Sequence, residues 1–349
     1  MLTPKNIAAY VQKAVVVDFK GFKGRHKFSF VDERGACCQW TVFLGNNNTG
    51  KTNLLKAIAS LELLKNIHGY GVVRTIKSQG IASDNAKTLY ADNLLNNGKL
   101  INFEDWLFQL DYAAKNEQQR ATSRLALLKS VLISDIFPEL SDIRFVSDEK
   151  LSNYIEFKTK DGWHKPAELG YGYQATLSWM CDFCKRMFDR YPNSEQPLRE
   201  PAVLLVDELD LHLHPQWQRT IIKYLSDIFP ATQFIVTTHS PFIIQSMQRV
   251  NLYTLQLEGD HTLVRHYGMR SFLGWRIEEI LGEIMGLENN IQTDTYQTLM
   301  KQFNDALSEE NYEKGKQAYD ELMKILHPQS TERKLLDIQL SQLIPDDKA

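Results

Sequence analysis

The sequence predicts an α/β fold, with a parallel or mixed sheet flanked by helices, a helical insertion and a helical C-terminal region. Two apolar segments, residues 202–206 and 234–237, predict the sheet, because continuous apolar runs suit strands that are buried on both faces. Residues 215–228 between them have helical periodicity. A strand–helix–strand order is typical of a parallel sheet.

The bulk composition is that of an ordinary soluble protein. The chain has 349 residues, 43% of them hydrophobic and 24% charged, and a formal net charge of −3. This charge does not indicate a basic nucleic-acid binder, although a local basic patch is compatible with it. We expect a cytoplasmic protein without membrane association, because no apolar run is long enough to span a bilayer and the N-terminus has no apolar signal segment.

The four cysteines do not have the spacing of a zinc site. Cys37 and Cys38 are adjacent, and Cys181 and Cys184 lie within a helical pattern. We therefore expect buried free thiols, which suit a reducing compartment.

The remaining elements follow in chain order. We expect strands at 15–19, 26–31, 39–44, 143–145 and 154–157, helices at 52–64, within 103–136 and at 175–188, and an irregular segment at 67–102. After residue 250 come a hairpin, 252–257 with 262–267, and amphipathic helices at 276–285, 295–307 and 312–326. The expected domains are residues 1–250, with a helical insertion at about 65–150, and residues 251–349, which would bind a partner or serve oligomerisation.

A phosphate-binding loop is the strongest motif. It fits the pattern G-x-x-x-x-G-K-(S/T) in full, follows an expected strand and precedes an expected helix, with the residues Gly45, Asn46, Asn47, Asn48, Thr49, Gly50, Lys51 and Thr52. Backbone N–H groups of such a loop face an anion, and the helix N-terminus adds its dipole. Lys51 would reach the β- and γ-phosphates and the Thr52 hydroxyl would bind Mg²⁺. The motif predicts ATP and Mg²⁺ as ligands.

Acidic residues and a histidine follow the two apolar strands. Asp207 is placed to hold Mg²⁺ and Glu208 to activate the attacking water; the alternative is a pair that caps the next helix. His239 ends the next strand at the same sheet edge and could hydrogen-bond the γ-phosphate. His212 and His214 are either metal ligands or, as a more ordinary interpretation, loop and helix-cap residues.

Four motifs together resemble those of ABC-type ATPases. GNNNTGKT, LGYGYQ, LLVDELDLHLHP and IVTTHSPF are similar, in this order, to the Walker A, signature, Walker B and switch-histidine motifs of the SMC/RecF/OLD (AAA-15/21) group. The resemblance covers residues 14–247. It implies an ABC-type ATPase head that forms a head-to-head dimer or higher oligomer with composite sites. A weak candidate for the glutamine of the Q-loop is Gln79.

The signature carries one departure from that group. The resemblance implies that Gly170, Tyr171, Gly172 and Gln174 contact a nucleotide bound to the neighbouring subunit. Gly170 stands where serine is usual, so backbone N–H groups and the helix dipole remain but a hydroxyl is missing. This change favours weak dimerisation or low turnover.

Further phrases resemble the ATPase (PtuA) of Septu-type anti-phage systems, some of which accompany retrons: FEDWLFQLDYAAKN, YGYQATLSWMCDF and GWRIEEILGEIMGLE. That resemblance implies control of a separately encoded HNH-type nuclease. A built-in nuclease is not expected, because residues 251–349 contain no D-x-D. Two alternatives stay open. One is a DNA-repair ATPase that clamps DNA through the basic run 20–27, which is otherwise a solvated hairpin face. The other is a low-turnover nucleotide-sensing module, which Gly170 supports.

Overall fold

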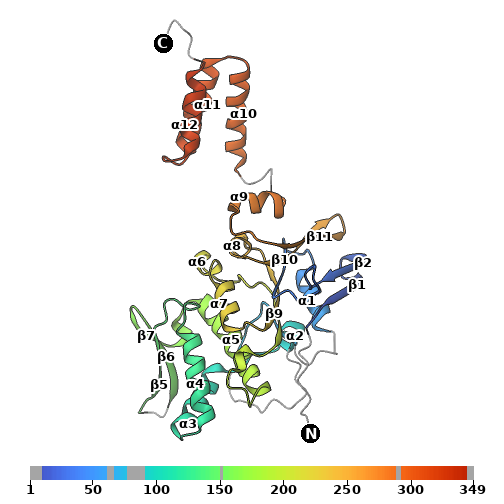
Figure 1. The fold of residues 1–349 in the computed structure, drawn as a ribbon. Coiled ribbons are helices and arrows are strands. Elements are labelled where there is room, and N and C mark those ends of the chain that lie inside the picture. Colours follow the sequence, from blue (N-terminus) through green and yellow to red (C-terminus); the bar gives the residue numbers. More distant parts are fainter. Residues whose placement is uncertain (1–9, 61–66, 77–90, 150–151, 288–291, 344–349) are drawn as a thin grey trace. The chain divides into compact units, whose positions relative to one another are not determined.

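The computed structural model describes residues 10–60, 67–76, 91–149, 152–287 and 292–343. The chain divides into two compact units, Met1–Ile277 and Glu278–Ala349. The first unit contains a six-stranded sheet with the strand order β11–β10–β3–β9–β8–β4. Three of its strands, β9, β10 and β11, are labelled in Figure 1. Five strands are parallel and β11 is antiparallel at one edge. The predicted α/β class with a mixed sheet flanked by helices is confirmed.

The central strands are the apolar ones. All residues of β8 (Ala202–Val206) and β9 (Thr232–Thr238) are buried, and β3 (Trp40–Gly45) lies beside β9. The predicted hairpin forms β10 (Val250–Glu258) and β11 (His261–Arg270). It lies in the sheet of the first unit, beyond the boundary expected at residue 250.

The edge strand β4 (Ile67–Tyr70) corrects the expectation of an irregular segment at 67–102. This strand pairs in parallel with β8, and α2 (Asp92–Asn96) follows it. Four residues that include His68 and Gly69 have no strand periodicity of their own. The pairing with β8, a segment far away in the sequence, makes them a strand.

Helices cover both faces of the sheet. On one face, α1 (Lys51–Ala59) packs Leu54, Leu55 and Ile58 into a core that includes Val203 and Leu205. On the other face, α5 (Tyr171–Arg190) places Trp179 against Tyr70 and Phe183 against His68, with ring centroids 5.8 Å and 5.0 Å apart. The alternating residues of β4 therefore face α1 and α5 in turn.

Smaller elements complete the first unit. β1 (Lys13–Phe19) and β2 (Phe22–Ser29) form the predicted hairpin, and a second antiparallel sheet contains β5 (Asp142–Ser147), β6 (Asn153–Thr159) and β7 (Gly162–His164). The helices are α3 (Phe103–Lys115), α4 (Gln119–Leu132), α6 (Pro215–Gln218), α7 (Ile221–Ile228) and α8 (Pro241–Gln245), with short turns η1 (Pro166–Glu168) and η2 (Pro197–Arg199). In the described part of the chain, no helix combines the length and apolar character needed to cross a membrane.

The second unit is helical. A short helical segment, α-helical over α9 (Ile277–Glu279) and π-helical over η3 (Ile280–Ile284), lies where a helix was predicted at 276–285. Three helices follow, α10 (Asp294–Ser308), α11 (Tyr312–Ile325) and α12 (Thr331–Ser341). These three helices share their own apolar core, made of Phe303, Ala318, Leu322, Leu336 and Leu340. The predicted helical C-terminal region is therefore present.

Candidate functional site

The glycine-rich loop, residues 45–52, lies between β3 and α1, as its motif predicts. Its first and last glycines cannot carry a side chain. A Cβ on Gly45 would lie 2.3 Å from the carbonyl oxygen of Leu255. Gly50 has a φ of +85°, and its Cβ would lie 2.9 Å from Cε2 of Phe22. Both positions need glycine, which lets the loop follow the tight path of an anion site.

Lys51 is buried inside this loop. Its Nζ donates to the carbonyl oxygens of Gly45 at 2.7 Å and Asn46 at 2.8 Å. Burial lowers the pKa of Lys51 to about 8, while the carboxylates of Asp207 and Glu208 oppose that shift. The loop thus places one ammonium group beside its backbone amides, and such a group pairs strongly with phosphate oxygens.

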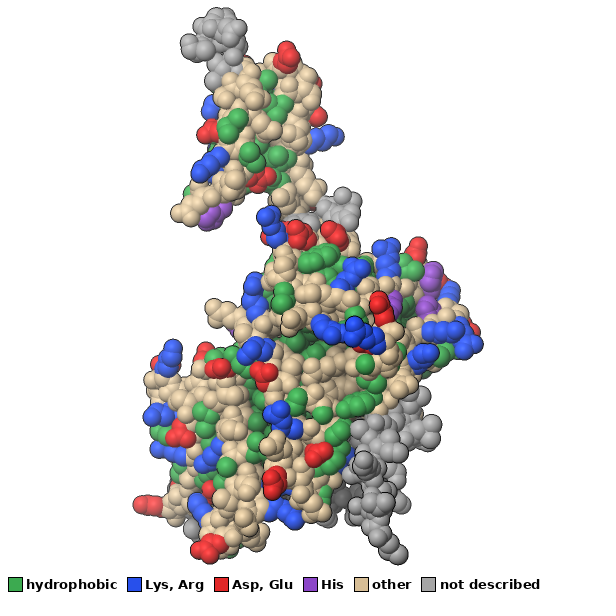
Figure 2. Space-filling model, viewed as in Figure 1, with side chains coloured by type: hydrophobic (Ala, Val, Ile, Leu, Met, Phe, Trp, Pro, Cys, Tyr) green, Lys and Arg blue, Asp and Glu red, His purple; other side chains and the backbone are tan. Residues whose placement is uncertain are grey.

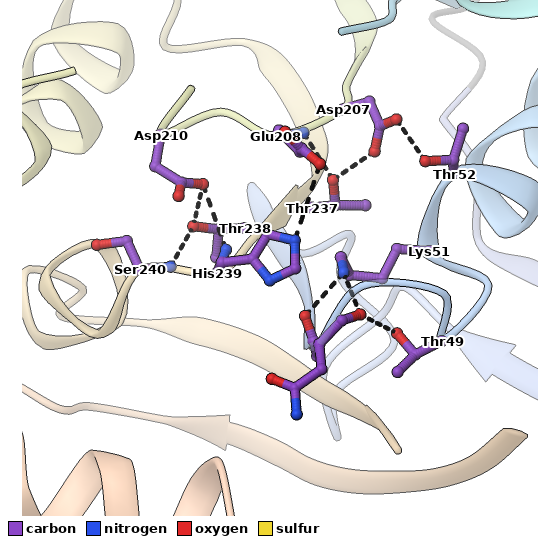
Figure 3. A network of polar contacts seen from close by, with 12 residues as sticks. Thr49, Lys51, Thr52, Asp207, Glu208, Asp210, Thr237, Thr238, His239 and Ser240 are labelled. Atoms are coloured by element: carbon purple, nitrogen blue, oxygen red, sulfur yellow. Dashed lines mark hydrogen bonds and ion pairs between the residues drawn. The ribbon is translucent and has the colours of Figure 1, made fainter. Parts of the chain in front are cut away.

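Asp207 joins three elements of the fold. Its carboxylate is buried at the end of β8. The hydroxyl of Thr52, in α1, donates to Oδ2 at 2.6 Å, and the hydroxyl of Thr237, in β9, donates to Oδ1 at 2.6 Å (Figure 3). A carboxylate and a hydroxyl in contact are oxygen ligands of the kind that Mg²⁺ binds, so these residues fit that ion.

Glu208 and His239 lie next to this network. Glu208 has a positive φ of 48°, and its N–H donates to the Thr237 hydroxyl at 2.7 Å. Its Oε1 is 3.8 Å from Nε2 of His239. Burial, and then the charge of Lys51, lowers the pKa of His239, so the imidazole is neutral at pH 7. Glu208 also lines a cavity of about 560 Å³ together with residues 47–53 of the loop.

Two further residues belong to the site although the sequence did not single them out. Asp210 accepts hydrogen bonds from the hydroxyl of Thr238 and, at 3.3 Å, from the N–H of His239. Arg74 donates from Nη2 to the carbonyl oxygens of Asp207 at 2.9 Å and Glu208 at 3.1 Å. Asp210 could have been predicted from the sequence as a site residue, because it follows Asp207 by only three residues. The contact of Arg74 with the acidic pair depends on the β4–β8 pairing, so no local sequence pattern predicts it.

The signature turn begins α5. Gly170 is its N-cap residue with φ −55° and ψ 148°, and a Cβ there would meet no atom within 4 Å. Tyr171 is 69% exposed. Gln174 donates from Nε2 to the carbonyl oxygens of Leu169 at 2.7 Å and Ala167 at 3.1 Å, so this amide holds the turn together.

This turn packs on the segment that follows Glu208. A Cβ on Gly172 would lie 2.2 Å from the carbonyl oxygen of His212, and the ring of Tyr171 meets the His212 ring edge-on at 4.8 Å. Among the described residues, no hydrogen bond joins the turn to the loop at 45–52. The roles of Gly170, Tyr171, Gly172 and Gln174 as nucleotide contacts across a dimer stay predictions.

The other candidate metal ligands have ordinary partners. His214 caps α6, since its Nδ1 accepts from the N–H of Gln216 at 3.4 Å. All four cysteines are free. In the described ranges, no cluster of three His, Cys, Asp or Glu side chains could hold a metal ion. Gln79, the candidate for the Q-loop, lies outside the described residues.

Comparison with known proteins gives several matches. Residues 77–245 match the family described as "AAA domain, putative AbiEii toxin, Type IV TA system". The Septu protein PtuA of Bacillus thuringiensis is 30% identical over 302 residues, which are 84% of this chain and 74% of that protein. A second Septu protein PtuA, from Bacillus mycoides, is 23% identical over 68% of this chain and 39% of that protein.

Other matches are shorter or more distant. The "Retron Ec83 probable ATPase" of Escherichia coli is 32% identical over 42% of this chain and 26% of that protein. This chain therefore spans well under half of the retron protein and of the second PtuA. A crystal structure of an SMC head bound to the C-winged helix domain of ScpA has a TM-score of 0.47 and 14% identity, and covers 74% of this chain and 98% of that chain.

Proposed function

Because this chain belongs to the Septu PtuA family, we propose that it is an ATPase of an anti-phage defence system and that it binds ATP together with Mg²⁺. One observation carries the proposal. A continuous path of hydrogen bonds runs from Thr52 through Asp207 to Thr237 and Glu208, and it joins a phosphate-binding loop to an acidic pair. Release of phosphate from ATP by the purified chain, with and without Mg²⁺, tests the proposal. Release no faster than in buffer would contradict hydrolysis.

The loop supplies the binding energy for the phosphates. Backbone N–H groups at the start of α1 and the ammonium of Lys51 provide positive charge inside a loop that excludes side chains at Gly45 and Gly50. Lys51 would exchange its two carbonyl acceptors for phosphate oxygens, which bear more negative charge and therefore form stronger hydrogen bonds.

Thr52 and Asp207 would hold Mg²⁺, which neutralises phosphate charge when it is bound. Thr237 keeps the Asp207 carboxylate in place through its second oxygen. Glu208 faces the cavity beside the loop and would orient water and take its proton. The neutral imidazole of His239 would hydrogen-bond the terminal phosphate, while Asp210 fixes the backbone N–H of His239.

We further propose that two heads associate face to face when ATP is bound. The exposed start of α5 supports this idea, since Gly170 and Tyr171 are available to a second copy of the chain. The absence of a hydroxyl at Gly170 leaves only the backbone N–H groups and the helix dipole for that contact. Association would consequently be weaker than with a serine.

The proposed output is control of a separately encoded nuclease of the HNH type. The second unit offers a surface to which such a nuclease could bind. Besides their shared core, its helices expose Ile325, Leu335 and Ile338 at 49%, 57% and 58%. Exposed aliphatic side chains on a small helical unit suit a protein partner. Co-purification of the full chain with the nuclease encoded beside it, compared with a chain truncated before residue 290, tests this step.

A second candidate is an ATPase that clamps DNA directly, and the β1–β2 hairpin favours it. Lys20, Lys23, Arg25 and Lys27 are exposed there, and basic side chains gather over this hairpin at the right-hand edge of the first unit in Figure 2. Turnover measured with and without duplex DNA separates the candidates. Stimulation by DNA that is lost on replacing Arg25 and Lys27 by glutamine supports a clamp. ATP binding without turnover would instead support a nucleotide sensor.

A further inference from the structure

Arg74 contacts the backbone of the acidic pair from the neighbouring strand. β4 and β8 are parallel, with Tyr70 opposite Val206, so both chains leave the sheet side by side. The N–H of Asp207 donates to the carbonyl oxygen of Tyr70 at 2.9 Å. Arg74, four residues after Tyr70, then donates from Nη2 to the carbonyl oxygens of Asp207 and Glu208, and from Nε to that of Gly71 at 3.2 Å.

The backbone of Glu208 needs such support. Its φ of 48° lies in the left-handed region, which is sterically disfavoured for any residue with a Cβ and persists only where the surroundings enforce it. Three hydrogen bonds enforce it here. The N–H of Glu208 donates to Thr237, while its carbonyl oxygen accepts from the N–H of Leu211 at 3.0 Å and from Arg74 at 3.1 Å. Only the last of these involves a cation.

Nη2 and Nε of Arg74 are satisfied by the three carbonyl oxygens, but one of its donors is not. Nη1 is buried and forms no hydrogen bond with any residue that the structure describes. Burial lowers the pKa of Arg74 to about 10, and the carboxylates of Asp207, Glu208 and Asp210 oppose that shift. The side chain therefore stays charged at neutral pH despite the cost of burial. A buried donor without a partner calls for an explanation, and a role in holding the acidic pair supplies one.

We propose that Arg74 is a positioning residue, which holds the main chain of Glu208 in the left-handed conformation that directs its carboxylate towards the phosphate loop. This inference rests on the proposed ATPase function. It does not require Arg74 to contact nucleotide, so binding and turnover should respond differently to its loss.

The test compares Arg74→Gln with a matched control, Arg124→Gln. Arg124 makes the same type of contact far from the site along the chain, since its Nη2 donates to the carbonyl oxygens of Tyr191 and Pro192, both at 3.1 Å. We expect Arg74→Gln to lower kcat about tenfold or more, as expected for a misplaced catalytic group, with Kd for ATP within about twofold. Arg124→Gln should leave kcat unchanged, although both variants should lower the melting temperature.

A cycle with Glu208→Gln tests whether Arg74 acts through Glu208. The double variant should turn over no more slowly than Glu208→Gln alone. An equal loss in both backgrounds, or an unchanged kcat in folded Arg74→Gln, would overturn the inference. If Arg74→Gln does not fold, Arg74→Met replaces it, because methionine fills similar space but has no donor for the two carbonyl oxygens. A kcat equal to that of wild type in this variant would overturn the inference. Absent turnover in the wild-type chain would instead refute the proposed function.

Discussion

Replacing Gly170 by serine tests whether the start of α5 meets a nucleotide in a second copy of the chain. The structure allows the substitution, because Gly170 has an ordinary negative φ and its Cβ would meet no atom within 4 Å. Serine also suits an N-cap position and should change the stability of the isolated chain by only a few tenths of a kcal/mol, about the difference between glycine and serine caps.

The expected gain appears only when ATP is bound. A hydroxyl that donates to a charged phosphate oxygen contributes roughly 1–2 kcal/mol, so dimer affinity should rise about 5- to 30-fold. Sedimentation of Glu208→Gln with and without Gly170→Ser, in ATP and in buffer alone, measures this change without consuming the nucleotide. No gain should appear in buffer, since the hydroxyl then has no acceptor.

Gly172→Ser is the matched control, two residues further along the same turn. Its Cβ would lie 2.2 Å from the carbonyl oxygen of His212, so the backbone of one segment has to move. Overpacking of this kind costs about 1–3 kcal/mol, which lowers the melting temperature by several degrees with or without ATP. If Gly170→Ser is folded and its dimer affinity with ATP is unchanged, the turn does not meet a nucleotide and the composite site is wrong.

Three further predictions concern the loop, the acidic pair and the second unit. Lys51→Ala should abolish ATP binding in calorimetry, because it removes the cation that the loop places at the phosphates; an affinity like that of wild type would contradict the loop assignment. Glu208→Gln should keep ATP binding but slow hydrolysis by about 10²- to 10⁴-fold, since an amide cannot take a proton from water; unchanged turnover would show that Glu208 is not the base. Deleting residues 290–349 should leave a folded ATPase, because the second unit has its own core, but should prevent assembly; a truncated chain that still binds its partner would rule out the interaction role.

Local patterns predicted the parts of the site that lie at the ends of apolar strands. The loop at 45–52, the acidic pair after β8 and His239 after β9 each follow a buried strand. In an open sheet with parallel strands, ligands bind at the carboxyl ends of those strands, so the strand positions alone brought these residues together. The hairpin of β10 and β11 was predicted for a similar reason, although its place in the main sheet was not.

What the sequence did not predict depends on contacts between distant segments. β4 is a strand because of its pairing with β8, and Arg74 reaches the acidic pair through that pairing. The start of α5 at Tyr171, four residues before the predicted start, includes Gly172, which is unfavourable inside a helix but is required by the approach of His212. No local pattern contains such information.

The register of β9 explains why the site is so strongly determined by the sheet. β9 lies between β3 and β8, with Phe43 opposite Thr237 and Val206 opposite Val236. Its last two hydroxyls serve different carboxylates, since Thr237 donates to Asp207 and Thr238 donates to Asp210. A slip of one residue would move each hydroxyl to the opposite face of the sheet and separate both carboxylates from their donors. The buried apolar residues before them, Phe234, Ile235 and Val236, prevent that slip, because it would turn Ile235 away from the core that it shares with α1. The packing of the core therefore sets the position of the polar site, and a variant that loosens β9 should impair turnover before it unfolds the protein.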